Sequence, residues 1–456
     1  MDDGGATLDA KKNPDTTFHA APKPLPAGAI TSDWPSFAGP THNMFSAETK
    51  LLANFPPGGP AVVWEVAKGE GYASPVILGD RLVLFHRVAD NEVIDCLHPA
   101  TGDRYWRFEY PTAYVDRYGY CNGPRSSPVI GGDYVYAVGA EGKLHCVNLK
   151  TGKLCWQRDL TKEFHLQQNF FGVGASPLVE GDLLIVNVGA PKGPCVAAFD
   201  LKTGKMVWGA GNKWGPSYAT PVPAVIQGKR RVLVFAGGES RPATGGLLCI
   251  DPANGQVDFE FPWRGRPSES VNASSPVVFG NQIFISECYG SGGVLLNIGP
   301  DMKPTPIWTN ENFGTHFMTA IPKEGYFYAV DGHGPNDAFF CCFEQKTGKE
   351  VWRHRPEWKE NIKLRDGVEH SLTFGTDRCN LLMIDGRCLC LGEWGHLLWV
   401  DLNPKDYKEV ERTWLFQAGE TWTPPVVSRG LLYICQSAKG ANGEPTRMLC
   451  YDFRGS

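Results

Sequence analysis

A turn followed by a tryptophan recurs along this chain at nearly constant spacing, and this repeat limits the available folds more than any other feature. The clearest copies read HPATGDRYW, NLKTGKLCW, DLKTGKMVW, DPANGQVDF and EQKTGKEVW. Together with weaker copies, they give eight aromatic anchors: Trp64, Trp106, Trp156, Trp208, Phe259, Trp308, Trp352 and Trp414. Neighbouring anchors are separated by 42 to 62 residues, which is close to the ~40 to 50 residues of one four-stranded propeller blade.

A second marker alternates with the first and also occurs eight times. It reads ASPV, SSPV, ASPL, ATPV, SSPV and TPPV, with weaker copies in HFMTA from His316 and HSLTF from His370. Small residues and proline suit the start of the innermost strand, where blades crowd the axis. The Thr-Gly or Asn-Gly turn closes the outer hairpin, and the aromatic residue after it can pack against the next blade. The sequence therefore predicts an all-β chain folded as a single eight-bladed propeller of four-stranded antiparallel blades.

The count of strands also predicts how the ring closes. After LLYICQ and MLCYDF the chain ends without another tryptophan, whereas AVVWEV around Trp64 precedes the first blade. We expect this N-terminal strand to complete the last blade and remove the exposed sheet edges. The propeller is predicted to span residues 33–456. Residues 1–32 are polar and rich in Ala, Pro and Lys, which predicts a flexible leader.

Composition excludes several classes of partner. The net charge of −5 and the pI near 6.1 give no electrostatic footprint for nucleic acid or anionic lipid. No apolar run approaches the ~18 residues of a membrane span, and we expect a monomer. Among the 14 cysteines, Cys96, Cys146, Cys249 and Cys342 each lie six residues before a turn glycine, a position that Ala198 fills in another repeat. This spacing predicts buried free thiols, because equivalent positions of different blades lie too far apart for disulfides.

The xDxxTGxxxW turn, the [AS]-[ST]-P strand and the segment WPSFAGPTHNMFSAET resemble those of tryptophan-docking, PQQ-like repeat propellers, including BamB-like proteins of bacterial envelopes. The resemblance implies that the anchor tryptophans are structural docking residues, and it implies a periplasmic or other extracytoplasmic location. The chain shows no signal peptide and its thiols are unpaired, so the sequence also leaves the cytoplasm open. Propellers host unrelated activities, so the resemblance specifies fold more closely than function.

Propeller geometry nominates a site at one mouth of the ring. The loops that lead into the inner strands, and the loops between second and third strands, such as that of Glu141, open on the same face. The candidate ligand-binding residues on them are Tyr72, Arg125, Tyr218, Asn272, Glu287, Asp331, Trp394 and Trp422. Trp394 and Trp422 could stack on a sugar or polyol.

Histidines and carboxylates of the same loops are candidates for a metal site or for catalysis. The candidate metal ligands are His316, His333, His370, Glu393 and His396, which are of the type that binds Zn, Mn or Fe. The candidate catalytic residues are Arg125, which could neutralise a carboxylate, His316 or His370, which could act as base, and Glu369.

The resemblance extends to quinoprotein dehydrogenases, which carry PQQ over the axis with calcium, an acidic base, a tryptophan floor and a vicinal disulfide. Cys341 and Cys342 are adjacent, but FFCCFEQKTGKEVW reads as a core strand leading into the repeated turn. Asn272 and Glu287 are the nearest candidates for a calcium set. The sequence contains no CxxCH haem motif.

These observations favour a non-enzymatic binding or scaffolding propeller of the bacterial envelope that presents a polar funnel mouth to a protein or glycan partner. The alternative is an enzyme at the same mouth: a PQQ- and calcium-dependent alcohol or sugar dehydrogenase, or a metal-assisted polysaccharide lyase or hydrolase. An enzyme requires several of the candidate groups to converge on one point.

Overall fold

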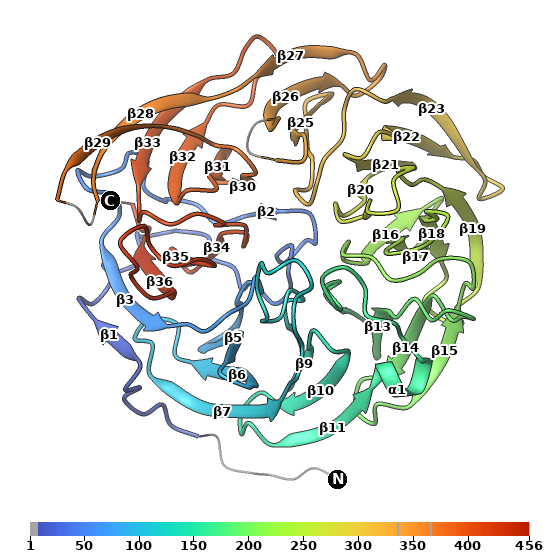
Figure 1. Cartoon of the computed structure of the whole chain (residues 1–456), viewed down its shortest axis with the longest axis horizontal. Coiled ribbons are helices and arrows are strands. Elements are labelled where there is room, and N and C mark those ends of the chain that lie inside the picture. Colours follow the sequence, from blue (N-terminus) through green and yellow to red (C-terminus); the bar gives the residue numbers. More distant parts are fainter. Residues whose placement is uncertain (1–7, 335–336, 365–366, 456) are drawn as a thin grey trace.

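The computed structural model describes residues 8–334, 337–364 and 367–455. They form eight four-stranded antiparallel blades around a central axis (Figure 1), which confirms the predicted all-β propeller. The described residues contain one helix, α1 (Leu160–Phe164), a short segment after blade 2 that is capped by Asp159. No helix in this part of the chain is long and apolar enough to cross a membrane.

The first four blades follow one another along the chain, each with its strands in order from the axis outward. Blade 1 is β4 (Val76–Leu78), β5 (Arg81–Val88), β6 (Asn91–Leu97) and β7 (Arg104–Pro111). Blade 2 is β8 (Val129–Gly131), β9 (Tyr134–Val138), β10 (Lys143–Asn148) and β11 (Leu154–Asp159). Blade 3 is β12 (Leu178–Glu180), β13 (Leu183–Asn187), β14 (Val196–Asp200) and β15 (Met206–Ala210). Blade 4 is β16 (Val222–Ile226), β17 (Lys229–Ala236), β18 (Gly246–Ile250) and β19 (Val257–Pro262).

The last four blades include the additions to the regular plan. Blade 5 is β20 (Val277–Phe279), β21 (Gln282–Glu287), β22 (Gly292–Ile298) and β23 (Pro304–Asn310). Blade 6 is β24 (Ile321–Lys323), β25 (Tyr326–Asp331), β26 (Phe339–Glu344) and β27 (Glu350–His354). Blade 7 is β30 (Asn380–Ile384), β31 (Arg387–Leu391), β32 (His396–Val400) and β33 (Glu409–Trp414), with β2 (Phe45–Ser46) on its inner edge. Blade 8 is β34 (Val426–Ser428), β35 (Leu431–Cys435), β36 (Arg447–Asp452) and β3 (Val62–Ala67), with β1 (Thr16–Phe18) on its outer edge.

The ring closes as the sequence predicts. Strand β3 is the outer strand of blade 8, and Trp64 pairs with Cys450 of β36. Strand β1, which lies within the predicted leader, pairs in turn with β3. A backbone bridge between Lys11 and Arg104 also ties this segment to blade 1. N- and C-terminal segments therefore form one sheet, and the edge of β36 is covered.

The core lies between neighbouring blades. One cluster joins Val83, Phe85 and Ile94 of blade 1 to Val135 and Ala137 of blade 2. A middle strand such as β5 is packed on both faces by other blades, and its residues 81–86 are all buried. This explains why such strands read as continuous apolar runs rather than as alternating ones.

The cysteine-bearing positions face the aromatic anchors. In seven blades an aromatic residue of the outer strand pairs with the third-strand residue just before a β-bulge. The pairs are Trp106 with Cys96, Trp156 with Cys146, Trp208 with Ala198, Phe259 with Cys249, Trp308 with Leu295, Trp352 with Cys342 and Trp64 with Cys450. A small partner leaves room for the large ring in six of the seven. The fourteen cysteines all lie in described residues and are free thiols.

Each paired tryptophan also contacts the next blade. The indole Nε1 of Trp106 donates to the carbonyl of Leu149 at 2.9 Å. A Cβ on Gly152 would stand only 2.6 Å from the same ring, so the turn requires glycine. Equivalent N–H bonds run from Trp64 to Pro99, Trp156 to Leu201, Trp208 to Pro252, Trp308 to Gln345 and Trp352 to Asn403.

Blade 7 departs from this pattern, and Trp414 does not take the place expected for it. The register places Glu411 opposite Trp399 at the position that an aromatic residue holds in the other blades. Trp414 lies at the far end of β33, where its Nε1 donates to the carbonyl of Trp394 at 2.9 Å. In this blade the large aromatic residue lies on the third strand instead. It is Trp399, which is fully buried and stacks on Phe55 with a centroid distance of 6.2 Å.

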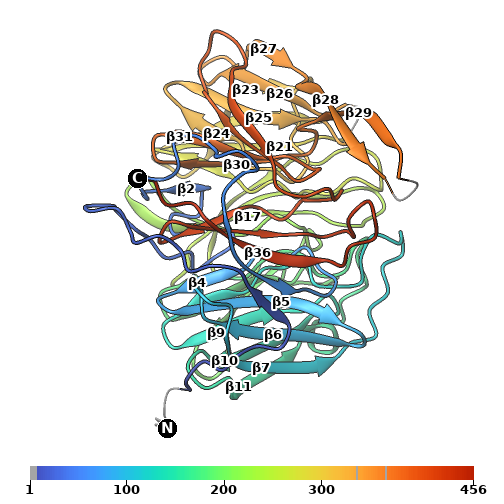
Figure 2. The same cartoon turned by 90° about the vertical axis from the view of Figure 1, so that its left-hand side faces the viewer.

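The expected inner strand at HSLTF is wrong for the same blade. Residues around His370 form β29 (Glu369–Gly375), which pairs with β28 (Glu357–Lys363) as a hairpin inserted between blades 6 and 7. The inner strand of blade 7 is β30, which begins ten residues later at Asn380. The apolar residues of HSLTF therefore belong to an addition at the rim, as Figures 1 and 2 show.

The segment before the first blade crosses the face opposite the predicted mouth. Trp34 pairs with Ile77 in β4, the N–H of Ile130 donates to the carbonyl of Pro35, and that of Met383 donates to the carbonyl of Met44. These partners belong to blades 1, 2 and 7. In Figure 2, β2 lies at the left of the ring and the β28–β29 hairpin at the right.

Candidate functional site

A cavity of about 230 Å³ lies on the propeller axis. All eight blades contribute to it from the residues that lead into their inner strands, from Tyr72 in blade 1 to Trp422 in blade 8, while Phe37 comes from the crossing segment. The aromatic residues that line it are Phe37, Tyr72, Tyr120, Phe171, Tyr218, Tyr289, Phe317 and Trp422. The site is thus an axial aromatic pocket, open on the predicted mouth.

Trp422 is the centre of the aromatic lining. Its ring stacks on Tyr72 with a centroid distance of 5.3 Å. Tyr120 and Phe317 lie 6.0 and 6.1 Å away, and the guanidinium of Arg378 lies 4.4 Å from the ring centroid. These contacts fix the indole in one orientation.

The polar groups of the lining are largely held by residues behind the wall. Arg125 pairs with the buried carboxylate of Asp116 at 2.7 Å. Arg378 pairs with Glu393, with Nε 3.0 Å from Oε2. The phenol of Tyr72 donates to Glu420 at 2.8 Å. The arginine charges are therefore offset by carboxylates, and the groups are fixed before any ligand arrives.

Two histidines meet on one side of the pocket. The ring centroids of His316 and His333 are 5.0 Å apart, and His316 Nε2 lies 3.1 Å from the hydroxyl of Tyr289. Burial, together with the nearby His333 and Arg378, lowers the pKa of His316 to about 3. His316 is therefore neutral at physiological pH and suits hydrogen bonding rather than charge pairing.

Comparison with known proteins places the chain in a family. The family model described as outer membrane protein assembly factor BamB matches residues 45–162 and 89–354. The chain belongs to this family.

Curated relatives of this BamB-family protein include dehydrogenases. It is 32% identical over 300 residues to the quinohemoprotein alcohol dehydrogenase ADH IIB of Pseudomonas putida, a match covering 56% of this chain and 39% of that protein. It is 28% identical over 282 residues to the dehydrogenase subunit of a quinone alcohol dehydrogenase from Gluconobacter oxydans (strain 621H), covering 56% of this chain and 35% of that protein. The matches thus span less than half the length of these relatives.

Solved structures share the fold of this BamB-family protein. The quinohemoprotein alcohol dehydrogenase of Comamonas testosteroni aligns with a TM-score of 0.63 at 13% identity, over 94% of this chain and 82% of that one. BamB from Moraxella catarrhalis aligns with a TM-score of 0.55 at 16% identity, over 87% of this chain and 98% of that one. At these identities the likeness shows the fold alone.

Six of the residues nominated from the BamB-like sequence line the axial pocket: Tyr72, Arg125, Tyr218, His316, His333 and Trp422. Three others bond to neighbouring backbone or side-chain groups outside the lining. Asn272 donates from Nδ2 to the carbonyls of Ala236 and Trp263. Glu287 accepts the backbone N–H of Tyr289, Ser291 and Gly292. Asp331 accepts the N–H of Gly314 and pairs with Arg353.

The remaining candidates are dispersed over blade 7 and the hairpin before it. Glu369 and His370 lie on β29. His396 stacks on Trp414 at 4.7 Å and lies 3.4 Å from Trp358 Nε1. Glu393 holds Arg378, and Trp394 donates to Asp377 at 2.8 Å. Only His316 and His333 of the five predicted metal ligands come together, and the described ranges contain no cluster of three or more His, Cys, Asp or Glu side chains suited to a metal.

The sequence analysis did not predict several residues that line the axial pocket of this BamB-family chain. Tyr120, Phe171, Phe317 and Arg378 each lie within the residues that precede an inner strand, so a wider window before each marker would have found them. Phe37 belongs to the crossing segment, and no local signal shows that this segment reaches the axis.

Proposed function

We propose that this BamB-family protein is a non-enzymatic binding propeller of the bacterial envelope, whose axial pocket holds a ring-shaped group of a protein or glycan partner. One observation carries the proposal: aromatic faces converge on the pocket, whereas the arginines and Tyr72 already have carboxylate partners behind the wall. Such a surface favours stacking and apolar contact over proton transfer.

The names of the dehydrogenase relatives raise quinone-dependent alcohol oxidation as the competing function, with PQQ and calcium. The residues of the axial pocket do not fit PQQ and calcium. Among the residues that the structure describes, no aspartate or glutamate lines the pocket, and calcium prefers carboxylate and carbonyl oxygens. Of the nearest candidates, Glu287 has both carboxylate oxygens committed to backbone N–H groups. Asn272 donates from Nδ2 to two carbonyls, and its Oδ1 is one buried oxygen, which does not make a calcium set. The described part of the lining therefore offers no carboxylate base toward an alcohol.

An envelope location is part of the proposal. It is supported by membership of a family described as an outer membrane assembly factor. The fold offers such a partner two kinds of surface, the mouth with its pocket and the blade edges around the ring.

The test is calorimetric titration with two panels of probes, oligosaccharides and short peptides that carry tryptophan or phenylalanine. We expect one panel to bind the wild-type protein, and we expect Trp422→Ala to weaken that binding at least tenfold. Trp394→Ala is the matched control, because Trp394 is a half-buried tryptophan in blade 7 outside the cavity. Binding by neither panel, or equal binding by both variants, would refute the proposed site.

A further inference from the structure

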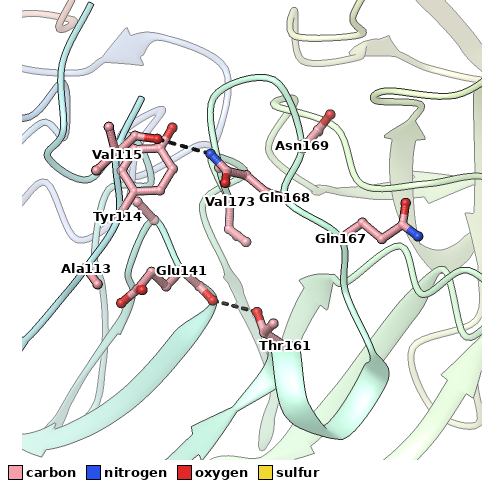
Figure 3. Close-up of a pocket in the computed structure, with 11 residues that line it drawn as sticks. Ala113, Tyr114, Val115, Glu141, Thr161, Gln167, Gln168, Asn169 and Val173 are labelled. Atoms are coloured by element: carbon pink, nitrogen blue, oxygen red, sulfur yellow. Dashed lines mark hydrogen bonds between the residues drawn. The ribbon is translucent and has the colours of Figure 1, made fainter. Parts of the chain in front are cut away.

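A second cavity, of about 300 Å³, lies beside the axial pocket (Figure 3). It is enclosed by the loop between β7 and β8, the turn between β9 and β10, and the segment from α1 to Val173. All three elements belong to the mouth face. Its volume lies at the small end of the range of ligand sites, which runs from roughly 300 to 1,000 Å³.

The second cavity is polar where the axial pocket is aromatic. Gln168 brings an amide to it, with Thr161 and Glu141 opposite, whereas the amide of the neighbouring Asn169 is bonded to Pro216, Phe170 and Glu239 outside the cavity. Figure 3 shows two of its internal bonds, from Gln168 Nε2 to the carbonyl of Val115 at 3.2 Å and from the Thr161 hydroxyl to the carbonyl of Glu141 at 2.6 Å. These bonds hold the walls of the cavity in place.

Glu141 is the one carboxylate among the described residues that line this cavity, and its charge is already neutralised. Glu141 Oε2 lies 3.0 Å from Lys143 Nζ and accepts the Thr112 hydroxyl at 2.9 Å. Partial burial alone would raise its pKa, but the hydrogen bonds from Lys143 and Thr112 hold the pKa below the usual value. The lining thus presents the amide of Gln168 and a compensated ion pair. Amides both donate and accept hydrogen bonds, as hydroxyl groups do.

Two loops form walls of both cavities. In the loop between β7 and β8, Tyr114 and Val115 line the second cavity and Tyr120 lines the axial pocket. In the loop that precedes β12, Gln168 lines the former and Phe171 the latter. The two cavities are therefore adjacent.

One buried carboxylate also connects the walls. Asp116 accepts the Tyr114 hydroxyl at 3.2 Å and pairs with Arg125 of the axial pocket at 2.7 Å. Its other oxygen accepts the N–H groups of Tyr118 and Tyr120. Asp116 therefore fixes the partition between the cavities from within.

We propose that the two cavities are adjoining subsites for one neutral oligosaccharide, with a sugar ring on Trp422 and the hydroxyls of a further unit on the amide of Gln168 in the second cavity. A sugar offers both features, since its ring has an apolar face and its edge carries hydroxyls. The offset charges on Arg125, Arg378 and Glu141 favour a neutral glycan over an acidic one. This inference rests on the proposed binding function and names its ligand class.

The experiment is titration calorimetry of the whole chain with malto-, cello- and chito-oligosaccharides of one to six units. We expect one series to bind with an affinity that rises with length and levels off once both cavities are filled. Gln168→Ala should weaken the longer members about tenfold, by loss of hydrogen bonds, and leave the shortest binder unchanged. Trp422→Ala should weaken every member.

The control is Gln256→Ala, an exposed glutamine in the β18–β19 turn, with thermal melts to show that each variant folds. Two results would overturn the second subsite and leave the axial site standing. One is an affinity that does not depend on oligosaccharide length. The other is that Gln168→Ala binds every length as tightly as the wild type while Trp422→Ala binds them more weakly. Binding of aromatic peptides at Trp422 without binding of any oligosaccharide would overturn the glycan while the proposed function survived.

Discussion

At the scale of single residues, the contact between an outer-strand tryptophan and the next blade is the repeated unit of stability. Trp106 is 6% exposed, faces Cys96, and bonds to the carbonyl of Leu149 in blade 2. A side chain placed in this way joins two sheets at once. Its loss leaves both a cavity and an unpaired carbonyl.

Trp106→Ala should lower the free energy of unfolding by roughly 3 to 5 kcal/mol, as expected for a buried aromatic truncated to alanine. The measurement is urea denaturation. Glu109→Ala is the control, because Glu109 lies on the same strand and is exposed. A loss below about 1 kcal/mol for Trp106→Ala, or an equal loss for both variants, would contradict the docking role.

His145 predicts how stability depends on pH. It is 4% exposed, its ring stacks on Tyr110 at 3.9 Å, and burial together with Lys143 lowers its pKa to about 4. The unfolded chain then binds a proton more readily than the folded one. The stability contributed by neutral His145 is therefore complete above about pH 6.5 and declines as pH falls toward 4.

Between pH 7 and pH 5 this residue should account for roughly 1 to 2 kcal/mol of lost stability. The phenylalanine variant His145→Phe retains the ring and cannot titrate, so its stability should fall less over the same interval. The exposed His165, whose left-handed conformation asparagine tolerates, supplies the control His165→Asn. Equal pH profiles for wild type and His145→Phe would show that His145 does not titrate as inferred.

At the scale of elements, the closing strand β3 holds the two ends of the ring together. Val63, Trp64 and Val66 are at most 3% exposed. Burial of such side chains contributes about 1.5 to 3 kcal/mol each. Lys68 adds a buried ammonium that donates to the carbonyls of Gly71 and Gln436, between blades 1 and 8.

A chain that begins at Ala67 should lose at least about 5 kcal/mol of stability relative to the full chain. A chain that begins at Lys11, which retains β1 and β3, is the control and should melt near the full length. Thermal melting and the rate of limited proteolysis measure the difference. Should the chain that begins at Ala67 melt at the same temperature as the full chain, β3 would not be the closure.

The strands also show which parts of the fold could be predicted from the sequence and which could not. Number of blades, strand order and closure followed from the repeat, because each turn glycine and its aromatic residue are set by local geometry. In blade 7 neither sequence marker predicted the structure. The large aromatic residue between the outer strands is Trp399 on the third strand rather than a residue of the fourth, and the segment at His370 forms an inserted hairpin rather than the inner strand. Such exchanges preserve buried volume without preserving sequence position.

At the scale of the whole molecule, the axial pocket exists only because eight separate segments meet on one axis. The sequence could nominate residues such as Tyr72, Arg125 and Trp422, since they precede inner strands. It could not show that Glu287 and Asp331 turn back to their own backbone, because such hydrogen bonds depend on loop conformation. Nor could it show that Phe37 reaches the axis from the other face.

On the proposed function, the axial pocket binds a partner and is not a quinone-dependent redox centre. Dye-linked alcohol oxidation by the purified chain after incubation with PQQ and calcium, with calorimetric titration of PQQ alongside, distinguishes the two. We expect no calcium-dependent binding of PQQ and no turnover above a buffer control. Calcium-dependent binding with turnover that His316→Ala abolishes would contradict the proposed function and make this protein an enzyme.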